Sequence, residues 1–219
     1  MDRDGLRARL LKLDTCVVSD ALDRLGIAGV ATGLTRLSTD RAVAGRVLTV
    51  RLEEAAGRTA ERHLCTGAVD AAEAGDVVVV EHHARSDCAG WGGILSCAAA
   101  AKGLSGVIVD GMCRDVDESR LFGFPVFARG AVPRTARGRI IETAFNVPVT
   151  VEGVTVAPGD WVLADGSGVA FLPQARAEEI VGVAEGLAAR EEAMLRAVRA
   201  GTPVGSVMAG NYERMLTEN

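Results

Sequence analysis

The region from residue 77 to residue 130 constrains the fold most strongly, because two kinds of apolar segment alternate there. Three segments are short and rich in β-branched or aromatic residues: 77–82 (VVVVEH), 106–111 (GVIVDG) and 124–130 (FPVFARG). Between them lie an alanine-rich segment at 91–103 and a shorter one at 115–123, both typical of helices. Strands that alternate with helices pair in parallel within one sheet. The sequence therefore predicts an α/β unit.

The flanking segments predict further elements around this unit. Apolar spacing predicts a helix over residues 13–26, with Asp14 or Thr15 as its N-cap and Gly26 at its end. We expect a strand at residues 42–52 and a helix near residues 59–74. Turn residues divide 148–173 into short antiparallel strands, and a long charged helix should follow from Gln174 to about Ala200. The chain is expected to form one domain, residues 1–219, with a mixed sheet, a parallel α/β unit and a long C-terminal helix.

Composition excludes several classes of protein. The 219 residues are 48% hydrophobic, which suffices for a large buried core. No 18-residue apolar run predicts a membrane span, and the charged N-terminus does not resemble a signal peptide, so we expect a cytoplasmic protein. The net charge of −5 argues against a nucleic-acid surface. Five scattered cysteines without a C-x-x-C pair indicate reduced, mostly buried thiols rather than disulfides or a zinc site.

The segment 109–119 (VDGMCRDVDES) places Arg114 and Asp115 just beyond a predicted strand. One interpretation is structural: Asp115 and Glu118 have the D-x-x-E spacing of a capping box, which binds backbone N–H groups where a helix starts. The other is functional, because ligands of parallel α/β sheets gather at the carboxyl ends of the strands. There an arginine can bind a carboxylate and an aspartate can bind Mg²⁺ or Mn²⁺. Spacing alone favours the capping box.

Two other patterns follow strands of the same unit. Gly92 and Gly93 precede the alanine-rich helix, where they form either a simple entry turn or a close backbone approach to an anion. His82 and His83, followed by Asp87 and Cys88, match no zinc spacing, so we expect a loop there. The sequence contains no G-x-G-x-x-G after a strand, no phosphate-binding P-loop and no G-x-S-x-G, so a nucleotide cofactor or serine hydrolase is not supported.

At these residues the chain resembles the RraA-like family. This family includes class II 4-hydroxy-4-methyl-2-oxoglutarate / 4-carboxy-4-hydroxy-2-oxoadipate aldolases and the regulator of ribonuclease activity for which it is named. The order and spacing of many segments carry the resemblance, notably VVSDALDRLG (17–26), AGDVVVVE (74–81), WGGILSCAAAAKGLSGVIVDGMCRDVDE (91–118) and VPVTVEGVTVAPGDWVLADGSGVAFLP (147–173). The resemblance implies a swivelling β/β/α fold and a homotrimer, sometimes stacked into a hexamer, with active sites between subunits.

The resemblance also implies roles for particular residues. Arg114 would bind the pyruvyl carboxylate and carbonyl region of a 2-oxo acid, and Asp115 would hold the divalent metal, partly through waters. The backbone amides of Gly92, Gly93, Ile94 and Leu95 would bind the substrate carboxylate. Glu191 or Glu192 of a neighbouring subunit would join the site through water. Aldolase members often carry Asp or Glu where this chain has Gly93, so a nearby carboxylate is missing here. The resemblance therefore does not fix the affinity for the metal or the identity of the substrate.

Lysine content bears on the reaction. Aldol cleavage needs an acceptor for the electrons of the breaking C–C bond, either a lysine Schiff base or a metal. The chain has only Lys12 and Lys102 against 22 arginines. Lys12 precedes a helix and Lys102 ends one, so neither suits a Schiff base.

We therefore expect a Mg²⁺- or Mn²⁺-dependent lyase that cleaves a pyruvyl-containing 2-oxo acid through a metal-stabilised pyruvate enolate. The same chemistry would decarboxylate oxaloacetate, because that reaction passes through the same enolate. The alternative is a non-catalytic regulator that binds a ribonuclease or another protein. A methyltransferase is a distant third, since no glycine-rich nucleotide loop is present.

Overall fold

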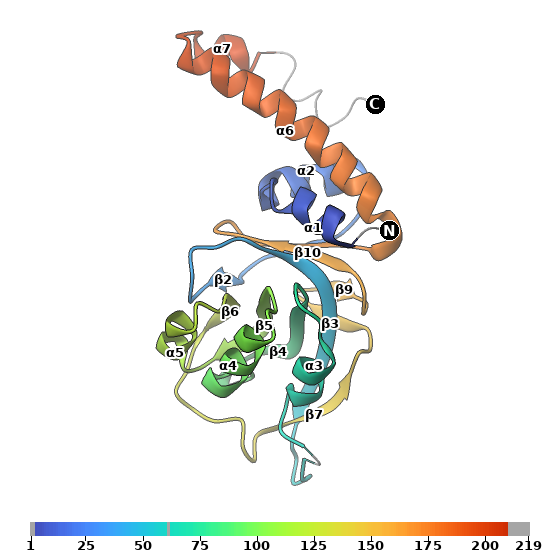
Figure 1. Cartoon of the computed structure of the whole chain (residues 1–219), viewed down its shortest axis with the longest axis vertical. Helices are drawn as coiled ribbons and strands as arrows, with labels where there is room; N and C mark the ends of the chain where they lie inside the picture. Colours follow the sequence, from blue (N-terminus) through green and yellow to red (C-terminus); the bar gives the residue numbers. More distant parts are fainter. Residues whose placement is uncertain (1–2, 61, 210–219) are drawn as a thin grey trace.

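Four parallel strands form the middle of the main sheet in the computed structural model, which describes residues 3–60 and 62–209 (Figure 1). They are β3 (Val43–Glu54), β4 (Val77–Ala89), β5 (Gly106–Cys113) and β6 (Val126–Ala131), adjacent in that order. Residues 77–82 and 106–111 are buried throughout, as expected for parallel strands covered on both faces. The predicted parallel α/β unit is confirmed.

Antiparallel strands extend this unit on both sides. Beyond the start of β3 follow β10 (Trp161–Ala164), β11 (Val169–Leu172) and β1 (Val30–Ala31), while β2 (Thr35–Arg36) pairs with β6. The second half of β3 pairs with β7 (Ile140–Phe145). A separate hairpin joins β8 (Val149–Val151) to β9 (Val154–Val156). Glu152 and Gly153 turn this hairpin with φ values of 49° and 80°, the positive angles of a type I′ turn.

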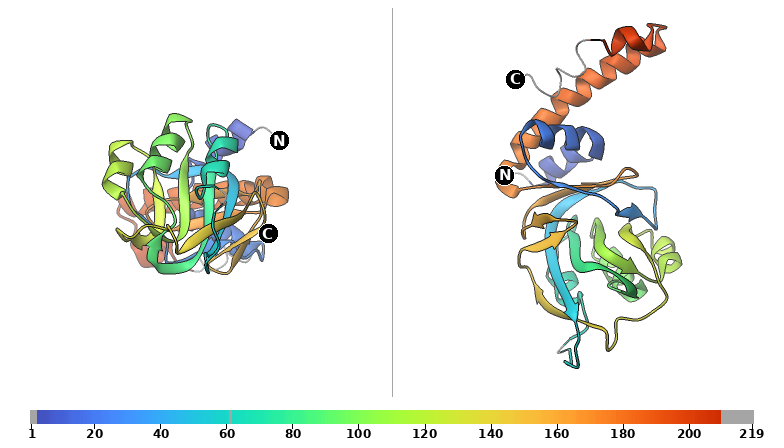
Figure 2. Two further views of the ribbon diagram at one scale, coloured as in Figure 1. Left: turned by 90° about the horizontal axis from the view of Figure 1, so that it is seen from below. Right: turned by 180° about the vertical axis from the view of Figure 1, so that it is seen from behind.

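Three short helices cover one face of the parallel strands: α3 (Thr66–Ala71), α4 (Gly93–Ala101) and α5 (Val116–Leu121) (Figures 1 and 2). Trp91 and Phe124 stack in the core beneath them, with ring centroids 6.1 Å apart. The helix predicted near residues 59–74 is much shorter than expected. Cys65 has a left-handed backbone (φ 64°) directly before α3, and Ala72 is extended directly after it.

A second group of helices packs on β10 and β11: α1 (Arg3–Leu10), α2 (Thr15–Arg24) and α6 (Ala177–Arg199). As predicted, Asp14 caps α2 by accepting a hydrogen bond from the Val17 N–H, and Gly26 (φ 65°) follows its end. The turn η1 (Gln174–Arg176) precedes α6, and α7 (Val204–Val207) follows it. The buried residues of α6 end at Leu187, and the rest of the helix projects from the body (Figures 1 and 2).

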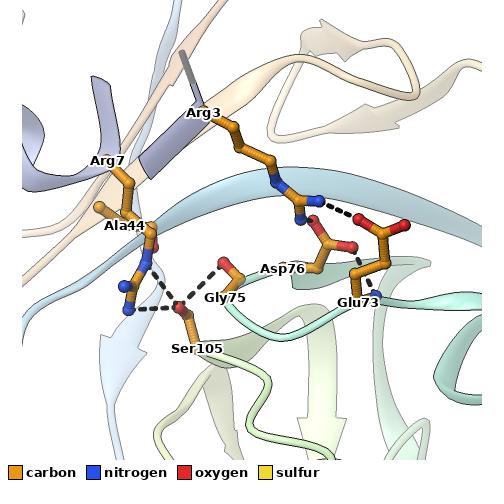
Figure 3. A network of polar contacts seen from close by, with 7 residues as sticks. All are labelled: Arg3, Arg7, Ala44, Glu73, Gly75, Asp76 and Ser105. Atoms are coloured by element: carbon orange, nitrogen blue, oxygen red, sulfur yellow. Dashed lines mark hydrogen bonds and ion pairs between the residues drawn. The ribbon is translucent and has the colours of Figure 1, made fainter. Parts of the chain in front are cut away.

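A polar network ties α1 to the parallel unit (Figure 3). Its members come from α1, the start of β3 and the turns before β4 and β5: Arg3, Arg7, Ala44, Glu73, Gly75, Asp76 and Ser105. Arg7 Nε donates to Ala44 O at 2.9 Å, and its guanidinium donates to Ser105 Oγ at 2.9 Å. Arg3 forms ion pairs with Glu73 and Asp76. The N-terminal helix is therefore fixed to the ends of the parallel strands by polar contacts.

The histidine pair contradicts the prediction of a loop. His82 and His83 lie inside β4, which continues through irregular pairing to Ala89. The His82 ring is buried, its Nε2 contacts Cys88 O at 2.9 Å, and burial lowers the pKa of the imidazole. Positive φ angles at His83 and Ala84 bulge the strand, so the His82 ring is buried in the core whereas His83 stays exposed within the strand.

Most of the cysteines are buried, as predicted. All five thiols are free, and Cys65, Cys88 and Cys113 are buried whereas Cys16 and Cys97 are exposed. Among the helices in the described ranges, none has both the length and the apolar character needed to cross a membrane.

Candidate active site

Asp115 follows β5 and caps a helix, but not the one that the capping-box interpretation required. Its backbone is left-handed (φ 56°, ψ 41°), and its side chain makes no capping hydrogen bond to α5. Instead Asp115 Oδ2 accepts a hydrogen bond from the Gly93 N–H, at 2.9 Å, where α4 begins. The left-handed backbone turns the carboxylate away from its own helix. Strained backbone of this kind is concentrated at functional sites.

Gly92 allows Arg114 and Asp115 to lie directly against the loop before α4. A Cβ at this position would lie 2.9 Å from Asp115 Oδ2 and 3.3 Å from Arg114 Nε, so only glycine fits without a shift. Arg114 Nε and Asp115 Oδ2 are 3.2 Å apart, and both side chains remain partly exposed. Side chains of the loop after β5 therefore pack directly against this glycine turn, and the approach of its backbone to a substrate anion stays a prediction.

Glu118 occupies the place of the side chain that Gly93 lacks. A Cβ built on Gly93 would stand 1.8 Å from Glu118 Oε2 and 3.2 Å from Asp115 Cβ. The carboxylate that the sequence lacks at residue 93 is thus supplied from α5, one helical turn after Asp115. The sequence analysis considered Glu118 only as part of a capping box. Its spacing of three residues from Asp115, which places both on one face of a helix, was the available signal.

A row of buried hydroxyl groups fixes α4 against α5. Trp91 Nε1 donates to Ser96 Oγ at 2.9 Å, and Ser96 Oγ is 2.8 Å from Ser119 Oγ. Ser119 Oγ in turn donates to Asp115 O at 3.2 Å. The Arg114 N–H donates to Trp91 O at 3.0 Å. These bonds join the two loops, so the spacing between the Gly92–Gly93 turn and the Arg114–Asp115 pair is held by the core.

All six residues that the sequence singled out line one small pocket of about 70 Å³: Gly92, Gly93, Ile94, Leu95, Arg114 and Asp115. Its other walls come from segments that the sequence analysis did not connect with the site: His63, Leu64, Ala89, Trp91, Thr135 and Ala136. The first group converges because β4 and β5 are neighbouring parallel strands whose carboxyl ends meet. In the second group, Ala89 and Trp91 lie at the end of β4 directly before Gly92, whereas His63, Leu64, Thr135 and Ala136 arrive through long-range packing, for which the sequence carries no local signal.

The first turn of α4 presents backbone amides to this pocket. The first N–H groups of a helix have no acceptor within the helix, and the helix dipole favours an anion there. The Gly93 N–H donates to Asp115, which leaves those of Ile94 and Leu95 for a ligand. Together with the Arg114 guanidinium, these groups form a site suited to a carboxylate.

Asp115 and Glu118 supply oxygen ligands of the kind that Mg²⁺ and Mn²⁺ prefer. Within residues 3–60 and 62–209, no group of three or more His, Cys, Asp or Glu side chains is arranged to hold a metal. One chain therefore offers two carboxylates at most, which suits Mg²⁺, an ion that usually keeps several waters. Burial raises the pKa of the neighbouring Cys113 thiol to about 11, which disfavours its thiolate form.

Lysines and the C-terminal glutamates lie away from this pocket. Lys102 Nζ donates to the carbonyl oxygens of Val69 and Asp70, and neither Lys12 nor Lys102 lines the pocket. Glu192 pairs with Arg196 on the projecting part of α6. Glu191 faces α2, where burial and then the charges of Asp14 and Asp20 raise the pKa of its carboxyl. Neither glutamate reaches the pocket of its own chain.

Comparisons with known proteins identify the family of this chain. The family model described as "RraA-like: Aldolase/RraA" matches residues 15–171. A Halalkalibacterium halodurans protein named "Putative 4-hydroxy-4-methyl-2-oxoglutarate aldolase" is 31% identical over 85% of this chain and 85% of its own length. Legionella pneumophila "Protein DlpA" is 28% identical over 90% of this chain, which spans only 32% of that protein.

Solved structures give the same answer. A Pseudomonas syringae protein described as uncharacterized superimposes with a TM-score of 0.85 at 30% identity, covering 93% of this chain and 96% of its own. Streptomyces coelicolor RraAS2, described as an unusual member of the RNase ES inhibitor RraA protein family, superimposes with a TM-score of 0.79 at 29% identity, covering 86% and 94%. Because the family model covers well over half of the sequence and the fold agrees, the chain belongs to the RraA-like family.

Proposed function

We propose that this protein is a divalent-cation-dependent lyase that cleaves a pyruvyl-containing 2-oxo acid. The reaction would be a retro-aldol cleavage of the 4-hydroxy-4-methyl-2-oxoglutarate type, with oxaloacetate decarboxylation as a second activity. One observation carries the proposal: the Arg114 guanidinium, the Asp115 carboxylate and free helix amides converge at one pocket, and a second carboxylate, that of Glu118, lies against Gly93 in its wall. Relatives named as aldolases of this type support the choice of substrate.

Each group has a role in binding such a substrate. The N–H groups of Ile94 and Leu95 would bind the carboxylate of the pyruvyl unit, and the helix dipole adds to this attraction. Arg114 would donate to the carboxylate and the adjacent keto oxygen, where negative charge develops as the C–C bond breaks. Its ion pair with Asp115, at 3.2 Å, holds the guanidinium in place before the substrate arrives. The small pocket favours a compact substrate.

Asp115 and Glu118 would hold the cation. Asp115 Oδ2 already accepts from the Gly93 N–H, which leaves Oδ1 as the free oxygen, and Glu118 approaches from the same side. The bound cation would supply a Lewis acid for the keto group of the substrate. A Schiff base is not part of the proposal, because neither lysine lines the pocket.

The decisive experiment measures pyruvate release from 4-hydroxy-4-methyl-2-oxoglutarate and from oxaloacetate, with Mg²⁺ or Mn²⁺ and after chelation. We expect turnover that chelation abolishes and the metal restores. Asp115→Asn keeps the acceptor for the Gly93 N–H but removes the charge, so it should fold and lose metal-dependent turnover. Wild-type protein without metal-dependent release from either substrate would refute the proposal.

A non-catalytic regulator is the second candidate, motivated by the solved RraA relatives described as inhibitors of RNA processing or of RNase ES. Such a protein needs an exposed contact surface, and Ile94 and Leu121 are 87% and 83% exposed. A Leu121→Asp variant separates the two functions. It should leave turnover intact if the protein is a lyase, and should abolish binding to a ribonuclease if the exposed apolar side chains contact one.

We further propose that the protein acts as a homotrimer or hexamer, with the pocket completed by a neighbouring subunit. Such an assembly would cover the exposed Ile94, which lines the pocket. It would also cover the projecting half of α6 (Figure 1). Glu191 or Glu192 would then approach a neighbour's site. Native mass spectrometry tests the assembly, and a monomer at micromolar concentration would refute it.

A further inference from the structure

Retro-aldol cleavage requires a base that removes the proton of the substrate hydroxyl group, and the pocket contains a candidate. The titratable side chains that line it are His63, Arg114 and Asp115. Arginine stays protonated in proteins, and Asp115 is engaged by the Gly93 N–H and Arg114. Histidine is the most frequent general base of enzymes near neutral pH. We propose that His63 is the general base of this site, an inference that rests on the proposed lyase function.

Hydrogen bonding leaves the correct nitrogen of His63 available. Its Nδ1 lies 3.1 Å from Leu64 O. A carbonyl oxygen can only accept, so Nδ1 carries the hydrogen of the neutral ring and Nε2 has the free electron pair. The side chain is exposed at the wall of the pocket. Among the described residues, the ring makes a hydrogen bond to Leu64 O through Nδ1, and none through Nε2. Nε2 is therefore free to accept a proton.

The turn that carries His63 is anchored to the rest of the site. Thr66 Oγ1 donates to His63 O at 2.7 Å. The Cys65 N–H donates to Glu142 Oε2 at 2.6 Å, and Cys65 Sγ contacts Gly90 O at 3.7 Å. Gly90 precedes the Trp91–Gly92–Gly93 turn that builds the opposite wall. The left-handed backbone of Cys65 (φ 64°) turns the chain into this position. The backbone that carries the imidazole is thus anchored by contacts to Glu142, Gly90 and Thr66.

The proposed step conserves atoms and electrons. His63 Nε2 takes the proton of the C4 hydroxyl, the C4–O bond becomes a carbonyl, and the C3–C4 bond breaks. The electron pair of that bond moves to C3 and is delocalised onto the C2 keto oxygen as the enolate of pyruvate. The imidazolium then returns the proton to C3, which gives pyruvate, so no co-reactant is consumed. Oxaloacetate decarboxylation removes CO₂ and has no hydroxyl proton to transfer, so it depends far less on this base.

This difference between two substrates supplies the test. His63→Asn keeps a side-chain N–H for Leu64 O but has no basic nitrogen. Relative to wild type, its retro-aldol rate on 4-hydroxy-4-methyl-2-oxoglutarate, divided by its oxaloacetate decarboxylation rate, should fall about 100-fold, as expected for loss of general-base catalysis. His83→Asn is the matched control, because His83 is exposed but does not line the pocket. Imidazole added to His63→Ala should restore part of the retro-aldol rate.

The outcomes distinguish this inference from the function on which it rests. A rate ratio in His63→Asn within threefold of wild type, without rescue of His63→Ala by imidazole, would overturn the role of His63 and leave the lyase function intact. Wild-type protein without turnover of either substrate would overturn both. Circular dichroism and Mn²⁺ titration of the variants show that any loss is not caused by unfolding or by loss of the metal.

Discussion

Gly93→Ala should weaken metal binding without unfolding the protein, because the new methyl group displaces a carboxylate. A Cβ at residue 93 would lie 1.8 Å from Glu118 Oε2, whereas ordinary contact begins near 3.4 Å. The carboxylate oxygen must therefore move by about 1.6 Å. Mg²⁺ binds oxygen at about 2.0–2.1 Å and tolerates little deviation. A displacement of this size removes Glu118 from the site while leaving its charge nearby.

The expected loss of metal affinity is much larger than the expected change in the free energy of unfolding. Loss of a group that completes a metal site typically costs about 10- to 100-fold in affinity. Stability should change by less than about 1 kcal/mol. Alanine favours a helical backbone over glycine by about that amount. The displaced carboxylate is exposed at the end of a flexible side chain, and only the Asp115 Cβ, at 3.2 Å, must give slightly.

Calorimetric titration with Mn²⁺ measures the affinity of wild type, Gly93→Ala, Glu118→Ala and the double variant. If the methyl group acts through Glu118, the double variant should bind no more weakly than Glu118→Ala alone. Asp117→Ala is the matched control, because that carboxylate is on the same helix and 94% exposed in a pair with Arg120. Mn²⁺ affinity of Gly93→Ala equal to wild type, or additive losses in the double variant, would refute the reasoning.

Further predictions concern binding and stability. Arg114→Lys should raise the KM for oxaloacetate about 10-fold or more in steady-state assays, because one ammonium replaces a two-pronged donor. Burial alone would raise the pKa of the Asp165 carboxyl, but hydrogen bonds from Thr15 hold it below 3.8. Asp165→Asn should therefore destabilise the protein in urea at pH 7, and the difference from wild type should shrink as the pH falls below 3.8. Arg7→Ala should cost about 1–3 kcal/mol in urea unfolding, since Ala44 O and Ser105 lose their donor. The exposed Arg176→Ala should leave the urea-unfolding midpoint unchanged, because solvent screens its pair with Glu179.

The sequence was informative where local pattern and global fold agree. Buried β-branched runs alternate with helices, so the parallel pairing of β4, β5 and β6 could be predicted, and with it the convergence of Gly92 and Arg114 at one edge, whereas the place of β3 beside β4 could not. The short α3 and the long β4 could not. In both places one or two residues with positive φ, such as Cys65 and His83, change the path of the chain, and tertiary contacts stabilise that change.

The walls of the pocket outside the two strand ends were also beyond prediction. His63 and Thr135 come from segments with no recognisable motif, and they reach the pocket only because residues far apart in the chain bond to each other. Ala89 N donates to Arg134 O at 3.0 Å, which places the segment after β6 beside the end of β4. Such contacts depend on packing, so no spacing within either segment could indicate them.

Gly93 and Glu118 are best understood as one unit, which changes the meaning of the missing acid. A side chain at residue 93 and the Glu118 carboxylate require the same space, since the Cβ of one would overlap an oxygen of the other. The absence of an acid at residue 93 is therefore the condition that lets a carboxylate arrive from α5. A comparison of residue 93 alone would indicate that a carboxylate has been lost, although the Glu118 carboxylate oxygen lies close to Asp115. What matters for the site is whether a carboxylate occupies the space next to residue 93. In this chain Glu118 of α5 occupies it.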